Sequence, residues 1–191
     1  MKKILVTGGT VFVSKIVAKY FASNKFKNEY QVYVLNRNNH SQVENVILIN
    51  SSRENLANKL EEYKFDIVID ITSYTKNDVK FILDSLGNSK DLVEKYILLS
   101  SSAVYPETLD LPFMESDKVG KNIFWNDYGL NKIEAENYLQ QNFSNYYIYS
   151  IILMIVIGYF FLLPYYKVWK KNLRFIIQNR QFDKMKEKEN E

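Results

Sequence analysis

The chain has 191 residues, which is enough for one substantial hydrophobic core but short for two full domains. Its formal net charge of +3 is nearly neutral, so we expect no nucleic-acid partner. The sequence has no cysteine, which excludes disulfides and thiolate catalysis. It has one histidine, His40, and we predict no metal site.

Short apolar runs alternate with amphipathic stretches along most of the chain. The runs are brief and rich in β-branched residues, as strands covered on both faces are. They span Lys3–Val6, Gln31–Leu35, Val46–Ile49, Asp66–Ile69 and Tyr96–Leu99. Helices are predicted over Val13–Ser23, Arg53–Tyr63, Asn77–Ser85 and Asp127–Gln141. This alternation predicts an α/β fold with a doubly wound parallel sheet, the Rossmann fold.

The first predicted strand leads into a glycine turn, Thr7-Gly8-Gly9-Thr10-Val11-Phe12-Val13-Ser14. Such a turn lets backbone N–H groups approach a pyrophosphate, and the N-terminus of the following helix favours its negative charge. We therefore predict dinucleotide binding here, the alternative being a turn that holds no ligand. The candidate cofactor residues in this turn are Gly8, Gly9, Thr10, Val11, Phe12 and Val13.

The second predicted strand ends in Asn36 and Arg37, which are further cofactor candidates. An acidic residue at this place usually binds the ribose 2′-hydroxyl of NAD, whereas an arginine accommodates the 2′-phosphate of NADP. No carboxylate is present, so Arg37 favours NADP over NAD by a small margin. A solvated loop arginine is the alternative interpretation.

Tyr128 and Lys132 lie four residues apart in the last predicted helix, so their side chains share one face. A cation beside a phenol favours the phenolate, and a nearby hydroxyl could hold a substrate oxygen while the phenol moves its proton. Three serines, Ser100 to Ser102, end the fifth predicted strand. The same residues also fit an ordinary amphipathic helix and a capped strand end.

Together these motifs resemble the extended short-chain dehydrogenase/reductases, the NAD-dependent epimerase/dehydratase family. The glycine turn is similar to the family's TGGxGFIG opening, but Val11 and Ser14 replace two of its three spaced glycines. The segment SSSAVY, ending at Tyr105, and the segment YGLNKIEAE, beginning at Tyr128, are similar to two further family signatures. The resemblance covers residues 1 to about 140.

The resemblance implies a catalytic role for Tyr128 as acid/base, for Lys132 in activating it and binding the nicotinamide ribose, and for Ser101 in holding the substrate oxygen. It also implies cofactor contacts at Ser52, where relatives carry an aspartate, and along Ile71, Thr72 and Ser73. The expected function is a cytoplasmic NAD(P)-dependent epimerase/dehydratase-like oxidoreductase acting on a sugar nucleotide or similar substrate. The alternative is a degenerate, non-catalytic nucleotide-binding module.

The pattern changes after about residue 145. Residues 146–166 form 21 consecutive positions without a charge, and residues 167–191 are strongly charged. Tyr147–Ile151 is a candidate strand, but the Arg-Pro turn with which relatives continue is not found. We expect a Rossmann domain over 1–145 whose substrate region is missing or replaced by a hydrophobic tail, through truncation or frameshift. The alternative is a purposeful membrane anchor, because residues 146–166 fit a membrane helix as well as they fit a packed strand and helix.

Overall fold

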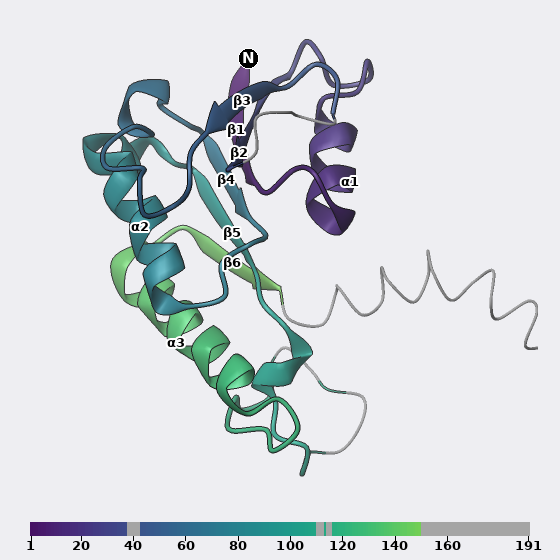
Figure 1. The fold of residues 1–191 in the computed structure, drawn as a ribbon, viewed down its shortest axis with the longest axis vertical. Helices are drawn as coiled ribbons and strands as arrows, with labels where there is room; N and C mark the ends of the chain where they lie inside the picture. The colour runs from purple at the N-terminus through teal and green to yellow at the C-terminus, as the bar shows by residue number, and fades with distance from the viewer. Residues whose placement is uncertain (38–42, 110–112, 114–115, 150–191) are drawn as a thin grey trace, which may run out of the picture. The chain divides into compact units, whose positions relative to one another are not determined.

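The computed structural model describes residues 1–37, 43–109, 113 and 116–149. It contains a six-stranded sheet in the order β3-β2-β1-β4-β5-β6, in which all neighbouring strands are parallel (Figure 1). The strands are β1 (Lys2–Thr7), β2 (Tyr30–Asn36), β3 (Ile47–Asn50), β4 (Ile67–Asp70), β5 (Lys95–Leu99) and β6 (Tyr146–Tyr149). The strand order reverses between β1 and β4, as in doubly wound nucleotide-binding sheets, so the predicted fold class is confirmed.

Helices cover both faces of the sheet. They are α1 (Phe12–Phe21), α2 (Lys76–Leu86) and α3 (Asn126–Asn142). Figure 1 shows α1 on one face and the pair α2 and α3 on the other. The alternation along β1 explains this, because Ile4 and Val6 pack in one core with Ala18 of α1, while Leu5 packs in the other with Leu139 of α3. All five side chains are completely buried.

The predicted helix over Arg53–Tyr63 is wrong. The segment forms successive turns and ends in a short 3₁₀ helix, η1 (Glu61–Tyr63). Leu56 and Leu60 are both buried, and their spacing of four produced the helical pattern. Ala57 between them has a φ of 47°, a left-handed conformation that interrupts an α-helix. Hydrogen bonds therefore join residues three apart, as from Lys59 N to Leu56 O.

The described part of the candidate strand Tyr147–Ile151 belongs to β6 (Tyr146–Tyr149), which pairs parallel to β5 from Tyr96 and Tyr146 to Leu99 and Tyr149. The predictions for the rest of residues 146–166, and for residues 167–191, lie outside the described residues. In the part of the chain that the structure describes, no helix has both the length and the apolarity needed to cross a bilayer.

Candidate active site

The glycine turn between β1 and α1 has the backbone shape that its sequence predicts. Gly8 and Gly9 have φ values of 94° and 74°, which side-chain-bearing residues rarely adopt. A Cβ on Gly8 would lie 2.9 Å from Ser14 Oγ and 2.9 Å from Thr72 Cγ2, and one on Gly9 would lie 2.3 Å from Val34 Cγ1. Glycine is therefore required at both positions, because the turn lies in close contact with neighbouring elements.

The two residues that replace family glycines have different surroundings. Ser14 is buried, and its Oγ donates a hydrogen bond of 2.8 Å to Val11 O, so it ties the start of α1 back to the turn. Val11 is 71% exposed, so its side chain is not packed into the turn. Phe12 has a φ of 52°, an unfavourable conformation for this residue type. The turn thus has positive φ values at Gly8, Gly9 and Phe12, and only at Phe12 is this conformation strained.

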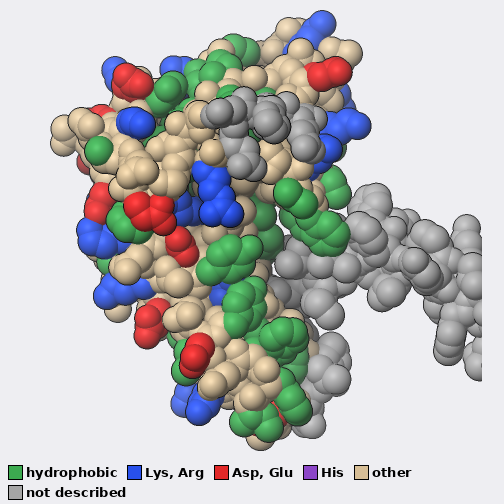
Figure 2. Space-filling view, in the orientation of Figure 1, with side chains coloured by type: hydrophobic (Ala, Val, Ile, Leu, Met, Phe, Trp, Pro, Cys, Tyr) green, Lys and Arg blue, Asp and Glu red, His purple; other side chains and the backbone are tan. Residues whose placement is uncertain are grey.

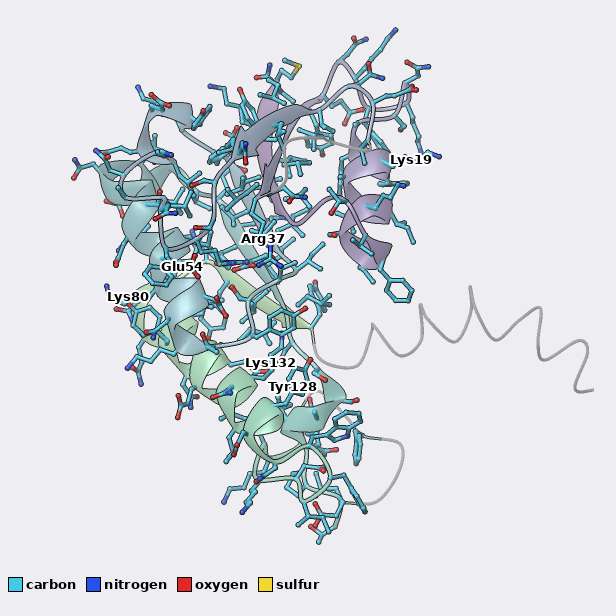
Figure 3. The ribbon with its side chains drawn as sticks, viewed as in Figure 1. Lys19, Arg37, Glu54, Lys80, Tyr128 and Lys132 are labelled. Carbon is cyan, nitrogen blue, oxygen red and sulfur yellow. The ribbon has the colours of Figure 1, made fainter. Side chains whose placement is uncertain are left out.

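The end of β2 supports the glycine turn. Asn36 is buried, and its Nδ2 donates hydrogen bonds to Gly8 O at 2.8 Å and Thr10 Oγ1 at 3.1 Å. Arg37, the next residue, is exposed. Figure 3 shows Arg37 apart from Tyr128 and Lys132.

The residues after β3 and β4 meet under the glycine turn. Ser52 is partly buried, and its neighbour Arg53 is an internal residue whose Nη2 lies 2.8 Å from Asp70 Oδ1. The backbone N–H groups of Ile71 and Thr72 donate to Thr7 Oγ1 at 2.9 and 3.2 Å. The segment after β4 therefore runs directly beside the turn, although the two are more than sixty residues apart in the chain.

Lys132 of α3 is almost completely buried, with 2% of its surface exposed. Its ammonium donates to Ser73 O at 2.7 Å and to Leu99 O at 3.0 Å, at the carboxyl ends of β4 and β5. It also lies 5.0 Å from the ring centroid of Tyr74. Burial lowers the pKa of Lys132 to about 8, although the nearby carboxylates of Asp70 and Glu136 oppose the change.

Tyr128 lies one helical turn before Lys132 on α3 (Figure 3). It is 37% exposed, and its ring centroid lies 6.3 Å from those of both Tyr74 and Trp125. Trp125 and the preceding Phe124 are also exposed, and Figure 2 shows hydrophobic side chains gathered on this side of the molecule. Tyr128 is thus accessible to a ligand, whereas Lys132 beneath it is not.

Ser101 lies in the segment against which the start of α3 packs. Its Oγ accepts a hydrogen bond of 3.2 Å from Ala103 N and caps the short 3₁₀ helix η3 (Ser102–Val104). A Cβ on Gly129 would lie only 2.4 Å from Ala103 O. The absence of a side chain at Gly129 therefore lets the helix residue after Tyr128 touch the segment that carries Ser101.

The structure thus forms two groups from the predicted site residues. The glycine turn, Asn36 and the Ile71–Ser73 segment lie together, and Tyr128, Lys132 and Ser101 lie at the ends of β4 and β5. Ser73 belongs to both groups, because its carbonyl accepts from Lys132.

Sequence reasoning gave no role to three polar residues that support these groups. Asp70 is a charged residue at the end of an otherwise apolar strand, and this charge was a signal in itself. Asn122 accepts hydrogen bonds from Phe124 N and Trp125 N just before α3 begins, at 2.9 and 3.2 Å. Glu136 is buried and accepts a hydrogen bond from Ser100 Oγ.

Three solved structures illustrate the fold that this chain shares. The UDP-Glc/GlcNAc 4-epimerase of Campylobacter jejuni is 16% identical with a TM-score of 0.60, over 74% of this chain and 49% of that one. The Bordetella bronchiseptica enzyme WbmG in complex with NAD is 13% identical with a TM-score of 0.60, over 78% and 51%. The ADP-L-glycero-D-manno-heptose-6-epimerase of Helicobacter pylori is 21% identical with a TM-score of 0.57, over 76% and 52%.

The chain therefore spans about half the length of these solved structures, and at such identities the likeness shows the fold alone. No curated protein matches the sequence. The model of the NAD dependent epimerase/dehydratase family, however, matches residues 4–161, most of the chain. The chain belongs to the NAD dependent epimerase/dehydratase family.

Proposed function

We propose that the chain binds NAD or NADP over the carboxyl ends of its strands and exchanges a proton with a sugar-nucleotide substrate through Tyr128, Lys132 and Ser101. One observation carries the proposal. The buried Lys132 ammonium is fixed on Ser73 O and Leu99 O, one helical turn below the accessible Tyr128. Burying an ammonium is costly, so a lysine held in this way is a strong candidate for a functional group.

The residues around the turn fit a dinucleotide. A helix begins directly after the turn, and its N-terminal N–H groups favour the negative charge of a pyrophosphate. We assign the pyrophosphate to Gly8–Val13, the adenosine end to Asn36, Arg37 and Ser52, and the nicotinamide side to Ile71–Ser73 and Lys132. The exposed Arg37 supports NADP, whereas the family description names NAD. When bound, the dinucleotide supplies hydride acceptance and return.

Tyr128 and Lys132 of α3, together with Ser101 after β5, would carry out the proton exchange. The Tyr128 phenol would exchange a proton with the substrate hydroxyl or carbonyl oxygen, and the Lys132 ammonium would favour its phenolate form. Ser101 Oγ already accepts from Ala103 N, so its O–H can donate to the same substrate oxygen. The matching solved structures include enzymes named for UDP-sugars, which supports a sugar nucleotide as the substrate class.

The second candidate is a nucleotide-binding module without turnover. Two observations favour it: Val11 and Ser14 replace family glycines, and the chain spans only about half the length of the solved structures that it matches. In this case the cofactor turn would work, but no substrate would be held over Tyr128.

The substitution Tyr128→Phe tests the proposal and separates the two candidates. We expect the wild-type chain to enhance the fluorescence of NADH or NADPH and to convert a UDP-sugar. The variant should keep its dinucleotide affinity within about twofold and lose activity by about 10²–10⁴-fold, since only the proton donor is removed. Tyr138→Phe, on the same helix, is the matched control and should retain activity.

Two other outcomes are informative. Dinucleotide binding without turnover of any UDP-sugar by the wild-type chain would favour the non-catalytic module. Binding of neither dinucleotide at millimolar concentration would contradict both candidates.

A further inference from the structure

Asp70, at the end of β4, is a fully buried carboxylate with four donors around it. Its Oδ1 accepts from Thr7 Oγ1 and Arg53 Nη2, both at 2.8 Å. Its Oδ2 accepts from Ser73 Oγ at 2.5 Å and from Tyr96 OH at 2.7 Å. The donors come from the end of β1, from the segments after β3 and β4, and from Tyr96 inside β5, so one side chain joins four parts of the sheet.

The carboxylate stays ionised in this place. Burial opposes its charge, but the Arg53 guanidinium and the hydroxyl donors outweigh burial and hold the Asp70 pKa at about 2. At neutral pH the group therefore acts only as an acceptor, which fixes the direction of every hydroxyl that binds it.

One arm of this cluster leads to the glycine turn. Thr7, which directly precedes Gly8, donates its hydroxyl proton to Asp70. The oxygen of the same hydroxyl then accepts from the N–H groups of Ile71 and Thr72. The Thr72 side chain packs against Gly8, where a Cβ would lie 2.9 Å from Thr72 Cγ2. The backbone of the glycine turn and that of the segment after β4 therefore position each other.

The other arm leads to the lysine. Ser73 is fully buried and donates its Oγ proton to Asp70, while its backbone carbonyl accepts from Lys132 Nζ at 2.7 Å. Asp70 thereby holds the residue whose carbonyl positions the ammonium, without touching the ammonium itself.

We propose that Asp70 is a positioning residue that locks the glycine turn and the backbone acceptor of Lys132 into one rigid unit. The inference rests on the proposed function, since it assigns the turn to the cofactor and the lysine to proton exchange. Tyr96 donates to the same carboxylate from inside β5, and among the described residues its hydroxyl makes no hydrogen bond to either arm, so it provides a matched control.

The test removes one donor at a time from the full chain. Thr7→Val removes the hydrogen bond from the glycine turn to Asp70, and Thr7→Ser keeps it. Ser73→Ala removes the hydrogen bond that links Asp70 to the lysine's acceptor. Tyr96→Phe is the control. Asp70→Asn is avoided, because it leaves the buried Arg53 without its counter-charge and endangers folding.

Two quantities are measured for each variant, alongside its free energy of unfolding in urea. The first is the dissociation constant for NADH and NADPH, from fluorescence. The second is the titration midpoint of Lys132 without ligand, from the ¹³Cε signal of labelled lysine, assigned with Lys132→Arg. The charged groups that act on this lysine include Asp70, Glu136, Asp78 and Arg53, the titratable phenols of Tyr74 and Tyr128 lie on the same side, and none of the six is substituted in any variant.

We expect Thr7→Val to weaken dinucleotide binding at least tenfold and to leave the Lys132 midpoint unchanged, with Thr7→Ser close to wild type. Ser73→Ala should lower the midpoint, because the ammonium loses a well-placed acceptor. Tyr96→Phe should change neither quantity, although it loses stability as the others do.

The proposal would be overturned if Tyr96→Phe changed the dinucleotide affinity as much as Thr7→Val does and the Lys132 midpoint as much as Ser73→Ala does. Asp70 would then be a general structural support. An unchanged midpoint in Ser73→Ala would also overturn it. If the wild-type chain binds neither dinucleotide, the proposed function fails on its own, and the Lys132 midpoint in Ser73→Ala still decides whether Asp70 positions the lysine.

Discussion

Asn36 occupies the strand end at which an acidic residue would bind a ribose, but its amide performs a task that a carboxylate cannot. Nδ2 donates to both Gly8 O and Thr10 Oγ1, and these two bonds connect the end of β2 to the glycine turn. They fix the Gly8 carbonyl and the Thr10 side chain relative to β2.

Asn36→Asp should therefore weaken dinucleotide binding, although it introduces the acid that relatives commonly use. A carboxylate would face Gly8 O without a proton to donate, and such an unpaired buried contact costs about 1–3 kcal/mol. We expect a lower free energy of unfolding and a weaker NADH affinity by about tenfold, measured by urea unfolding and fluorescence. Asn50→Asp adds the same charge on the paired, exposed position of β3 and is the control. A tighter NADH affinity in Asn36→Asp would show that the ribose contact dominates instead.

At this scale the sequence identified residues that carry recognisable local motifs. Tyr128 and Lys132 are four apart, and the glycines follow a strand, so both patterns were visible without the fold. Asp70 was missed because its role depends on partners far along the chain, such as Thr7, 63 residues before it. The roles of the predicted site residues in binding and catalysis stay predictions.

Among the elements, α3 is placed by the close approach of its first turns to η3. Gly129 makes this approach possible, because a Cβ there would lie 2.4 Å from Ala103 O. In a helix, alanine is normally favoured over glycine by about 1 kcal/mol, so the packing contact opposes the helix propensity.

Gly129→Ala should be destabilising despite that propensity. Overpacking against a backbone atom costs about 1–3 kcal/mol, and α3 can relieve it only by moving away from the Ser101 segment. We expect a lower urea midpoint and a larger loss of turnover than of dinucleotide affinity. Gly120→Ala, where the nearest atom is Pro106 Cγ at 3.0 Å, makes the same change with a smaller clash and should be nearly neutral. A Gly129→Ala variant as stable as wild type would contradict this account of α3.

The strands were easier to predict than the connections between them. Five strands were predicted at nearly their observed positions, because residues covered on both faces form uninterrupted apolar runs. The connection from β3 to β4 was predicted wrongly as a helix, since buried Leu56 and Leu60 have helical spacing in a segment of turns. The spacing of apolar residues predicts which of them are buried, but it does not distinguish an α-helix from a series of turns. The left-handed φ of Ala57 makes that distinction in the structure.

For the molecule as a whole, the site buries several charged side chains, among them Asp70 and Lys132, whose pKa values are both lowered. Asp70 has Arg53 as a partner and remains ionised at a pKa of about 2. Lys132 has two backbone carbonyls within hydrogen-bonding distance, and its pKa falls to about 8 because burial disfavours the ammonium. The stability of the folded chain should therefore depend on pH through these groups, in windows that differ between them.

Lys132 should make the folded chain relatively more stable as the pH rises above about 8. Below that pH the lysine is protonated in both states, and the folded state bears the cost of the buried charge. Between about 8 and the ordinary value of 10.5 the folded state has released its proton and the unfolded state has not. The unfolded state then binds more protons, so the free energy of unfolding increases with pH.

Urea unfolding of the wild type and of Lys132→Met at pH 7, 8, 9 and 10 isolates this contribution, because the other titrations are common to both chains. The wild type should gain up to about 1.4 kcal/mol per pH unit relative to the variant above pH 8, and no more than about 3 kcal/mol in total. Lys80→Met removes an exposed lysine of α2, labelled in Figure 3, and its difference from wild type should stay flat over the same range. A flat difference for Lys132→Met as well would mean that the ammonium is not destabilised by its burial, and the argument for a functionally retained lysine would lose its energetic basis.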